Sequence, residues 1–421
     1  MDLSNREQRS KMTLLGGLYI TQFLGLGFIV TAVPAIMRDI GYSLDQIGLI
    51  YVLGLIWALK FLWAPFIDRI GSKKHGHYRS WLLVMQSLMI VSLIGAAFFD
   101  ISSQISILAV FFALVSIFSA TQDIAADALA VTLLSPEERG LGNSIQVAGG
   151  FVGNLIGGGV LLITYQWFGW QASLLFLAAA TLLPLYNIWR HKEAPAPADA
   201  RSEKVGYRDM ARYFRRPGMG RWAAILLTYS MGIGIVYALL RPMLVDLGWS
   251  LDQIGFVTNI LGALIGILGA AVAGLITQRI GRKMAMLIAN GLVIVSILVL
   301  FPAAGGINNQ VLIYGSASLM LFAYGANATI LATMIMDKSD PTSAGTDYTL
   351  QYSVTSILTF ILSGAALALA ESIQYGGVLW LSIGLTVLSL VLIALYNNFE
   401  PIQVDEPNIL TVADDASVVT G

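Results

Sequence analysis

The chain contains no cysteine, and only three of its 421 residues are histidine. The absence of cysteine excludes disulfides, thiolate metal sites and a cysteine nucleophile, although it does not identify a compartment. The histidines His75, His77 and His191 all lie in polar segments that we expect to be loops. We therefore expect no metal site inside the protein and no cofactor.

Charged residues are also scarce. They make up 12% of the chain, while hydrophobic residues make up 57%. Soluble domains carry roughly 25% charged residues, and few soluble folds could bury so much apolar surface. The formal net charge of −1 gives no sign of a nucleic-acid partner. Composition therefore predicts a membrane protein whose surroundings are the lipid bilayer.

A phosphate-binding loop is missing as well. The glycine clusters lie inside apolar segments rather than after a strand, so ATP is not expected to be the direct energy source. Asp123 and Asp127 could in principle do acid–base work, but no nucleophile constellation accompanies them. The protein is therefore not expected to be an enzyme.

Long apolar segments are abundant, and a membrane span needs about 20 mostly apolar residues. On this basis the sequence predicts an all-α polytopic protein with twelve spans. They cover residues 13–37, 47–67, 80–99, 105–130, 144–164, 172–189, 222–245, 253–276, 284–303, 310–336, 348–371 and 377–396.

The chain repeats itself. Residues 41–48 read GYSLDQIG and residues 248–255 read GWSLDQIG, so seven of eight positions match at a separation of 207 residues. Such half-repeats are typical of membrane transporters whose site lies between the halves. We expect a six-helix bundle over 1–190, a linker over 191–221, a second six-helix bundle over 222–396, and a disordered tail over 397–421.

Basic residues set the expected orientation. If the N-terminus is cytoplasmic, 21 of the 24 lysines and arginines fall in cytoplasmic segments. Only Arg38, Lys60 and Arg241 are left over. Because cytoplasmic loops carry an excess of lysine and arginine, we expect both termini, the linker and the tail to be cytoplasmic.

A short basic loop follows the second span of each half. The loops read DRIGSKK from Asp68 and QRIGRK from Gln278. With the six-plus-six arrangement, they resemble the major facilitator superfamily, although Pro65 and Ser72 depart from that family's loop pattern in the first half. The resemblance implies that Asp68, Arg69, Arg279 and Arg282 act in gating. Arg69 and Arg279 in particular can pair with carboxylates or helix C-termini when the cytoplasmic side is closed.

Longer runs narrow the resemblance. WALKFLWAPFIDR (57–69), TQDIAADALAV (121–131), SPEERGLGNSIQ (135–146) and GTDYTLQYSV (345–354) are similar to the AmpG-like branch of that superfamily. This branch includes muropeptide permeases, acetyl-CoA transporters and the RhtX/FptX siderophore permeases. The short loops and the KFLWAP run look most like RhtX/FptX.

Few charges fall inside the predicted spans. A charge at the centre of a span costs at least ~2.5–3.5 kcal/mol, so such residues are functional candidates. Asp123 and Asp127 are four residues apart and share a helix face, and crowding raises the pKa of at least one carboxylate in such a pair. Lys60 lies at a similar depth, which makes a Lys60–Asp123 or Lys60–Asp127 pair plausible. The three residues either couple proton and substrate, or form a static clamp between two helices.

Other polar residues are candidates for substrate binding. Arg241 could bind an anionic group, snorkel to headgroups or pair with Asp246. An offset of 205 residues relates Gln146 to Gln351 and Gln122 to Asn327. We expect Gln122, Tyr324, Asn327 and Gln351 either to line a central cavity or to form ordinary bonds between helices.

The leading functional hypothesis is a monomeric, proton-driven permease of the cell inner membrane that imports a small molecule by alternating access. The likeness to RhtX/FptX implies a siderophore, as its ferric complex. The alternative within the branch is a muropeptide or anhydro-sugar permease of cell-wall recycling. The alternative of another class is a non-transporting membrane receptor on the same fold.

Overall fold

The computed structural model describes residues 3–72, 74–193 and 206–402. Lys73, the linker residues 194–205 and the tail residues 403–421 lie outside this range, and with them most of the predicted disordered tail. Across the described residues the protein is helical, and its strand-like pairing is limited to an isolated bridge between Ser72 and Gly76. Nine helices in this part of the chain are long and apolar enough to cross a membrane.

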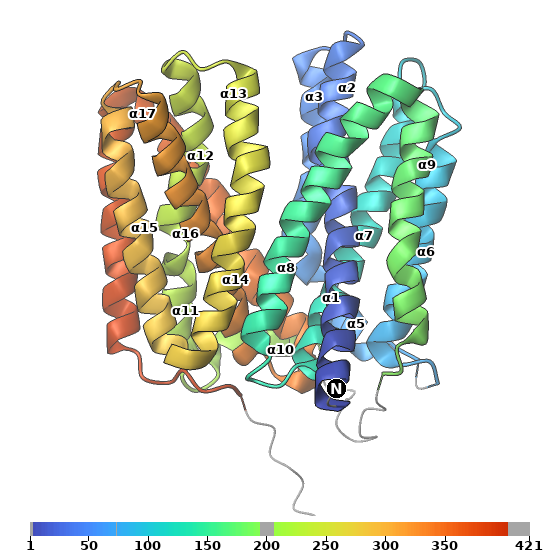
Figure 1. Ribbon diagram of the computed structural model, residues 1–421. Coiled ribbons are helices and arrows are strands. Elements are labelled where there is room, and N and C mark those ends of the chain that lie inside the picture. The colour runs from blue at the N-terminus through green and yellow to red at the C-terminus, as the bar shows by residue number, and fades with distance from the viewer. Residues whose placement is uncertain (1–2, 73, 194–205, 403–421) are drawn as a thin grey trace, which may run out of the picture.

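The first half of the chain forms one group of helices, on the right in Figure 1. In chain order its elements are α1 Leu3–Gly27, the π-helical η1 Phe28–Ala32, α2 Val33–Asp39, α3 Leu44–Tyr51, the 3₁₀ turn η2 Val52–Gly54, α4 Leu55–Leu59, the 3₁₀ turn η3 Lys60–Leu62, α5 Ala64–Arg69, α6 His77–Ala96, α7 Ile105–Leu133, α8 Arg139–Asn154, the π-helical η4 Leu155–Val160 and α9 Leu161–Arg190.

The second half forms the other group, on the left in Figure 1. It follows a short connecting stretch with α10 Tyr207–Arg212 and the 3₁₀ turn η5 Tyr213–Arg215. Its elements are α11 Met219–Tyr229, α12 Met231–Asp246, α13 Leu251–Gly255, the π-helical η6 Phe256–Leu261, α14 Gly262–Ile280, α15 Arg282–Ala304, α16 Gln310–Asp337, the 3₁₀ turn η7 Pro341–Ser343 and α17 Ala344–Leu395.

Two helices contain a break that separates predicted spans. In α9, Gly169 has φ 76° and ψ −177°, and in α17, Gln374 has φ 59° and ψ 170°. Glycine adopts a positive φ at little cost, whereas glutamine rarely does. The second predicted span is the broken series from α3 to α5, with a non-helical residue at Trp63. The number of twelve crossings therefore remains a prediction.

The repeated octapeptide has the same structure in both halves. Ser43 and Ser250 each begin a helix with a complete capping box, whose second members are Gln46 and Gln253. The serine hydroxyl accepts from the backbone N–H three residues on, and the glutamine side chain accepts from the serine N–H. The glycines that precede them, at positions 41 and 248, both have positive φ. The repeat therefore encodes a helix start.

Glycines allow α8 to lie directly against α1. A Cβ added at Gly149 would be 2.8 Å from the Cβ of Tyr19, and one added at Gly153 would be 2.5 Å from the carbonyl oxygen of Ile20. These distances leave no room for a side chain. The small-residue spacing in α8 thus produces a close helix contact, which brings Tyr19 of α1 near the polar groups of α7 and α8.

The two halves meet at one end of the molecule. We call this end, with the turns 70–76, 134–138 and 338–343, the basic end; it is at the bottom of Figure 1, beside the N-terminus. There α8 contacts α14 and α16, and α17 contacts α5 and α7. The two groups of helices stand apart at the other end of the view. Large apolar residues such as Leu183 and Val311 are exposed on the outside, as expected of a surface that faces lipid.

Candidate functional site

Lys60 and Asp123 form an ion pair deep in the first half. Lys60 lies on the turn η3, where the second span is broken, and Asp123 lies on α7. The two side chains are only 2% and 4% exposed. Removing one partner of a buried pair leaves an uncompensated charge, which costs about 3–5 kcal/mol. Of the two pairings that the sequence left open, the structure has Lys60 with Asp123.

Aromatic rings surround the Lys60 ammonium group. Its Nζ lies 5.3 Å from the ring centre of Trp57 and also 5.3 Å from that of Tyr352. A cation over an aromatic face gains up to about 2 kcal/mol when it is desolvated. Trp57 belongs to the first half and Tyr352 to α17 of the second. Lys60 therefore contacts both halves.

Asp127 lies one turn from Asp123 but has different partners. Its Oδ1 accepts hydrogen bonds from the Tyr19 hydroxyl at 3.2 Å and from Nε2 of Gln146 at 2.8 Å. Asp127 is 1% exposed, and no cation is paired with it among the residues that the structure describes. The two carboxylates thus differ: Asp123 is neutralised by a lysine, while Asp127 is held by neutral donors.

The predicted polar amides are not brought together. Gln122 donates from Nε2 to Thr21 at 3.2 Å inside the first half. Asn327 donates to Asn290 at 3.0 Å and accepts from Ser230 at 2.8 Å inside the second half. The expectation of a shared polar surface fails for this pair because each amide is bound within its own bundle.

Gln351 and Tyr324 also have partners within the second half. Gln351 is fully buried; it accepts from Nε1 of Trp222 at 2.7 Å and donates to Ser339 at 3.2 Å, among other acceptors. Its environment is that of a packing residue. Tyr324 stacks on Tyr237 with ring centres 4.7 Å apart.

Arg241 is exposed near the end of α12 opposite the basic end. Its Nη2 donates to Oδ1 of Asn259 at 2.9 Å. Asp246, the predicted ion-pair partner, instead accepts from the Tyr375 hydroxyl at 2.6 Å. The Arg241–Asp246 pair, one of the alternatives from the sequence, is therefore not formed.

At the basic end, the first loop acts through Asp68 rather than Arg69. Asp68 is 3% exposed and accepts from the backbone N–H groups of Gly345 at 3.0 Å and Thr346 at 2.7 Å, in the first turn of α17. A carboxylate is stabilised at a helix N-terminus by these free N–H groups and by the helix dipole. Arg69 is exposed and makes no hydrogen bond or ion pair with the described part of the chain. Of the two alternatives for Arg69, a carboxylate or a helix C-terminus, the structure has the second, because Arg69 lies in the last turn of α5. Its role in gating stays a prediction.

In the second loop, too, one charged residue bonds the opposite half and its neighbour in the loop does not. Arg282 donates from Nε to Asp337 at 2.7 Å and from Nη2 to the carbonyl oxygen of Pro136 at 2.5 Å. Arg279, three residues earlier, is exposed, and within the described ranges it has no hydrogen-bonded or ionic partner. Arg279 likewise lies in the last turn of its own helix, α14, which is the helix C-terminus alternative rather than a carboxylate pair. Its role in gating also stays a prediction. The guanidinium group of Arg282, which extends back towards the other half, makes the contact instead.

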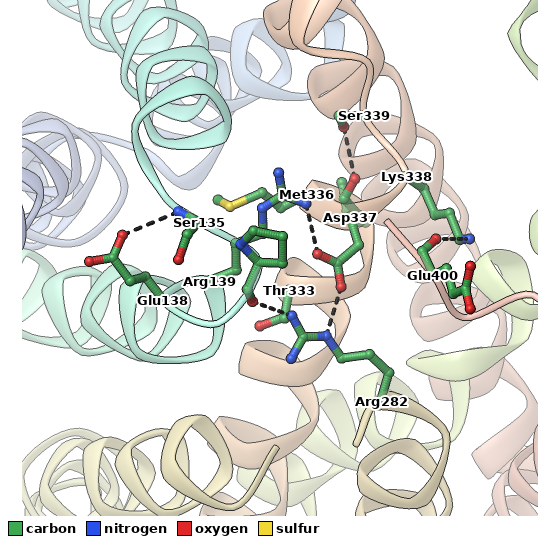
Figure 2. A network of polar contacts seen from close by, with 12 residues as sticks. Ser135, Glu138, Arg139, Arg282, Thr333, Met336, Asp337, Lys338, Ser339 and Glu400 are labelled. Carbon is green, nitrogen blue, oxygen red and sulfur yellow. Dashed lines mark hydrogen bonds and ion pairs between the residues drawn. The ribbon is translucent and has the colours of Figure 1, made fainter. Parts of the chain in front are cut away.

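Asp337 is the centre of this network, and the sequence analysis missed it. Figure 2 shows two arginines on one carboxylate: Arg139 of the first half donates to Oδ1 at 2.8 Å, and Arg282 donates to Oδ2. The Asp337 side chain is fully buried. The signal that could have revealed it is its position at the end of an apolar span, where a buried carboxylate needs cationic partners.

A further pair joins the connecting stretch to the second half. Arg216 donates to both carboxylate oxygens of Asp347, at 2.5 and 3.3 Å. Burial alone lowers the pKa of Arg216, but the Asp347 carboxylate outweighs it and raises that pKa above its ordinary value. This charge-assisted pair fixes the chain before α11 against the start of α17.

The contacts across the basic end are reciprocal. Asp68 of the first loop holds the start of α17, while Gln278 of the second loop donates to the carbonyl oxygen of Glu137 at 2.8 Å, just before α8. Each loop thus bonds the start of a long helix of the opposite half: the first loop bonds α17, and the second loop bonds the turn before α8.

A family model identifies this architecture. The model described as Major Facilitator Superfamily matches residues 15–241 and 222–410. The chain belongs to the major facilitator superfamily. As a member of this superfamily it is a multi-pass membrane transporter and not an enzyme.

Relatives of this major facilitator protein support the AmpG-like branch. The anhydromuropeptide permease of Escherichia coli strain K12 is 30% identical over 290 residues, which are 67% of this chain and 58% of that protein. The chain thus matches less than two thirds of the length of this relative. A putative transporter AmpG 3 of Rickettsia prowazekii is 26% identical over 84% of this chain and 88% of its own.

Solved structures share the fold. The human organic anion transporter MFSD10 (TETRAN) superimposes with a TM-score of 0.72 at 15% identity, over 92% of this chain and 99% of its own. A bacterial homologue of the iron transporter ferroportin, in an outward-facing state, gives a TM-score of 0.67 at 16% identity, over 91% and 98%. At such identities the likeness concerns the fold alone.

Proposed function

We propose that this transporter imports an anhydromuropeptide-type solute across the cell inner membrane, driven by the proton gradient. The likeness to the E. coli anhydromuropeptide permease supports this solute class over the siderophore that the 57–69 run suggested. The observation that carries the coupling is the unequal environment of two neighbouring carboxylates. Asp123 is paired with Lys60, and Asp127 is held by neutral donors only.

The roles follow from these environments. Asp127 binds and releases the proton, since among the described residues Lys60, the cation near it, is ion-paired with Asp123 instead. Lys60 and Asp123, beside Trp57 and Tyr352, contact the solute: the rings offer faces to a sugar or peptide, and the ion pair offers both charges. Binding of a charged group can compete with an ion pair at this position. Of the remaining predicted binding residues, Tyr324 and Arg241 stay candidates, whereas the bonds of Gln122, Asn327 and Gln351 favour packing.

Orientation and state complete the proposal. With 21 of 24 basic residues on that side, the basic end faces the cytoplasm. Its closure by Asp68, Arg139, Arg282 and Asp337 corresponds to an outward-facing state. Alternating access then requires these contacts to break as one half rocks against the other.

Uptake in cells that lack their own permease tests the proposal. Radiolabelled anhydromuropeptide should accumulate only when this protein is present, and an uncoupler should abolish the accumulation. Asp127→Asn should remove the uncoupler-sensitive part, whereas Asp100→Asn, on an exposed turn, should not.

Iron-loaded siderophores form a second arm of the uptake assay, because of the likeness of residues 57–69. Siderophore accumulation without anhydromuropeptide accumulation would contradict the proposed solute. No accumulation of either solute, with the protein present in the membrane, would contradict import and favour the receptor alternative.

A further inference from the structure

Asp127 is connected to the other half of the molecule through one side chain. Gln146 on α8 donates from Nε2 to Asp127 at 2.8 Å, and its Oε1 accepts from the Tyr348 hydroxyl at 3.0 Å. Tyr348 lies on α17, in the second half. Asp127 and Tyr348 are 1% and 0% exposed, and Gln146 is 8% exposed. The three groups therefore form a buried chain of hydrogen bonds across the interface between the halves.

The amide of Gln146 makes this chain sensitive to charge. Its oxygen only accepts and its nitrogen only donates. An ionised Asp127 requires the nitrogen on its side, so the oxygen is turned towards Tyr348, which donates to it. A protonated Asp127 can itself donate, and both orientations of the amide then become acceptable. The reversed amide can bond Tyr348 only by donating to the phenol oxygen, which is a weaker acceptor than the amide oxygen. Ionisation of Asp127 thus selects the orientation with the stronger bond to the second half.

Among the described residues, Lys60 is the cation whose charge acts on Asp127, but its ion pair is with Asp123. The charged groups near Asp127 are Lys60 and Asp123, which are paired with each other. The other groups facing it are neutral: Tyr19 from α1, which donates to the same Oδ1, and Tyr348 and Tyr352 from α17. A proton on Asp127 therefore changes mainly its bonds to Tyr19 and Gln146, and only the second of these continues into the other half.

We propose that Gln146 and Tyr348 transmit the proton load of Asp127 to the contact between the halves. This inference rests on the proposed function of Asp127 as the proton site. Ionised Asp127 fixes the Gln146 amide so that Tyr348 donates across the interface, which keeps the basic end closed. Protonation frees the amide, weakens this cross-half bond and lets the basic end open. A neutral hydrogen bond contributes about 0.5–1.5 kcal/mol, so its weakening corresponds to up to about a tenfold change in the open-to-closed ratio.

The second half has no such chain. Gln351, which an offset of 205 residues relates to Gln146, accepts from Trp222, and the residue that corresponds to Asp127 is Ala332. Gln351 is thus equivalent to Gln146, but the position equivalent to Asp127 holds an alanine in place of a carboxylate. Gln146 and Tyr348 are positioning residues that act through Asp127.

Cysteine labelling measures the opening directly, because the chain has no cysteine of its own. Ser144 is 4% exposed and faces Gly274 across the interface. In the purified full-length protein, the maleimide rate of Ser144→Cys is divided at each pH by that of Ser103→Cys, on an exposed turn, because the thiolate fraction itself changes with pH. This relative rate should be low above neutral pH and up to about tenfold higher below it. Asp127→Asn should remove the pH dependence. Tyr348→Phe should react fast at both pH values, because the cross-half bond is absent in either state.

Tyr229→Phe is the matched control. It removes another buried tyrosine hydroxyl, one that has no hydrogen-bond partner in the structure, and it should keep the pH response. Gln146→Leu interrupts the chain without touching Tyr348 and should behave like Tyr348→Phe; it replaces that variant if the latter does not purify as a folded monodisperse protein.

Three outcomes separate the inference from the proposed function. If Tyr348→Phe and Gln146→Leu keep the pH-dependent labelling, the inference is overturned, even if uptake stays coupled to protons. If labelling of the parent protein does not depend on pH, the inference is overturned as well. If labelling follows the expected pattern but neither solute is taken up, the chain of hydrogen bonds stands and the proposed import fails.

Discussion

The two halves of this transporter share a plan but not an interior. Both begin their second span with the same capping box, at Ser43 and Ser250, and both carry a basic loop at the same end. Inside the bundles, however, Asp123 and Asp127 of the first half correspond to Ala328 and Ala332 of the second, at an offset of 205 residues. The second half has alanine at the positions where the first half has these two carboxylates.

This difference suggests that the two halves contribute unequally to proton coupling but jointly to closure of the basic end. Each charge inside a bilayer is costly, and the proposed function needs only one proton site. The first half holds the ionisable groups, and the second half supplies neutral partners that respond to them, such as Tyr348 and the first turn of α17. The basic-end contacts, in contrast, are built from both halves.

The largest expected effect comes from breaking the ion pair of the first half. Lys60→Met leaves Asp123 buried without a cation, which should destabilise the folded protein by about 3–5 kcal/mol and abolish uptake. The combined variant Lys60→Met with Asp123→Asn removes both charges and should recover most of the stability but not the uptake. Thermal unfolding and solute accumulation are the measurements.

Lys74→Met, on an exposed turn, is the control for loss of a lysine and should leave both measurements unchanged. Recovery of uptake in the combined variant would show that the pair is a static clamp, as one alternative from the sequence has it. Asp127 would then be the only one of these three charged residues of the first half with a part in transport.

A smaller effect should distinguish the two arginines of the second loop. Arg282→Ala removes hydrogen bonds to Asp337 and to Pro136, and a bond to a charged group contributes about 1.5–3 kcal/mol. Maleimide labelling of Ser144→Cys should therefore be clearly faster in Arg282→Ala. Arg279→Ala, three residues away and without a described partner, should label like the parent protein. Equal acceleration by both would indicate that the charge of the loop matters rather than this contact.

Much of the architecture could be predicted from the sequence. The apolar segments follow from composition, because lipid imposes long apolar helices. The repeat can be read directly from the sequence, and the family follows from the resemblance of the basic loops and of the longer runs. Lys60, Asp123 and Asp127 could be singled out because charges inside apolar segments are rare and conspicuous. Their equal depth also suggested a pair, although only the structure distinguishes Asp123 from Asp127 as the partner of Lys60.

The partners across the interface could not be predicted. Asp68 and Arg69 are adjacent in the same loop, and which of them bonds the second half depends on the direction in which α5 ends. Asp337 meets Arg139, 198 residues away, and no local pattern encodes such a contact. The choice between anhydromuropeptide and siderophore could not be made from the motifs either, and the proposal rests it on the likeness to the E. coli permease.

The smallest expected effect compares the matched amides of the two halves. Asn327→Ala leaves Asn290 and Ser230 without their partner, whereas Gln122→Ala removes one bond to Thr21 from a side chain whose Oε1 has no partner. Hydrogen bonds between membrane helices average ~0.6 kcal/mol, so Asn327→Ala should lower the thermal midpoint slightly more. If Gln122→Ala instead weakens the apparent affinity for the solute with no change in stability, the free Oε1 of Gln122 is a solute contact. The first half would then carry recognition as well as coupling.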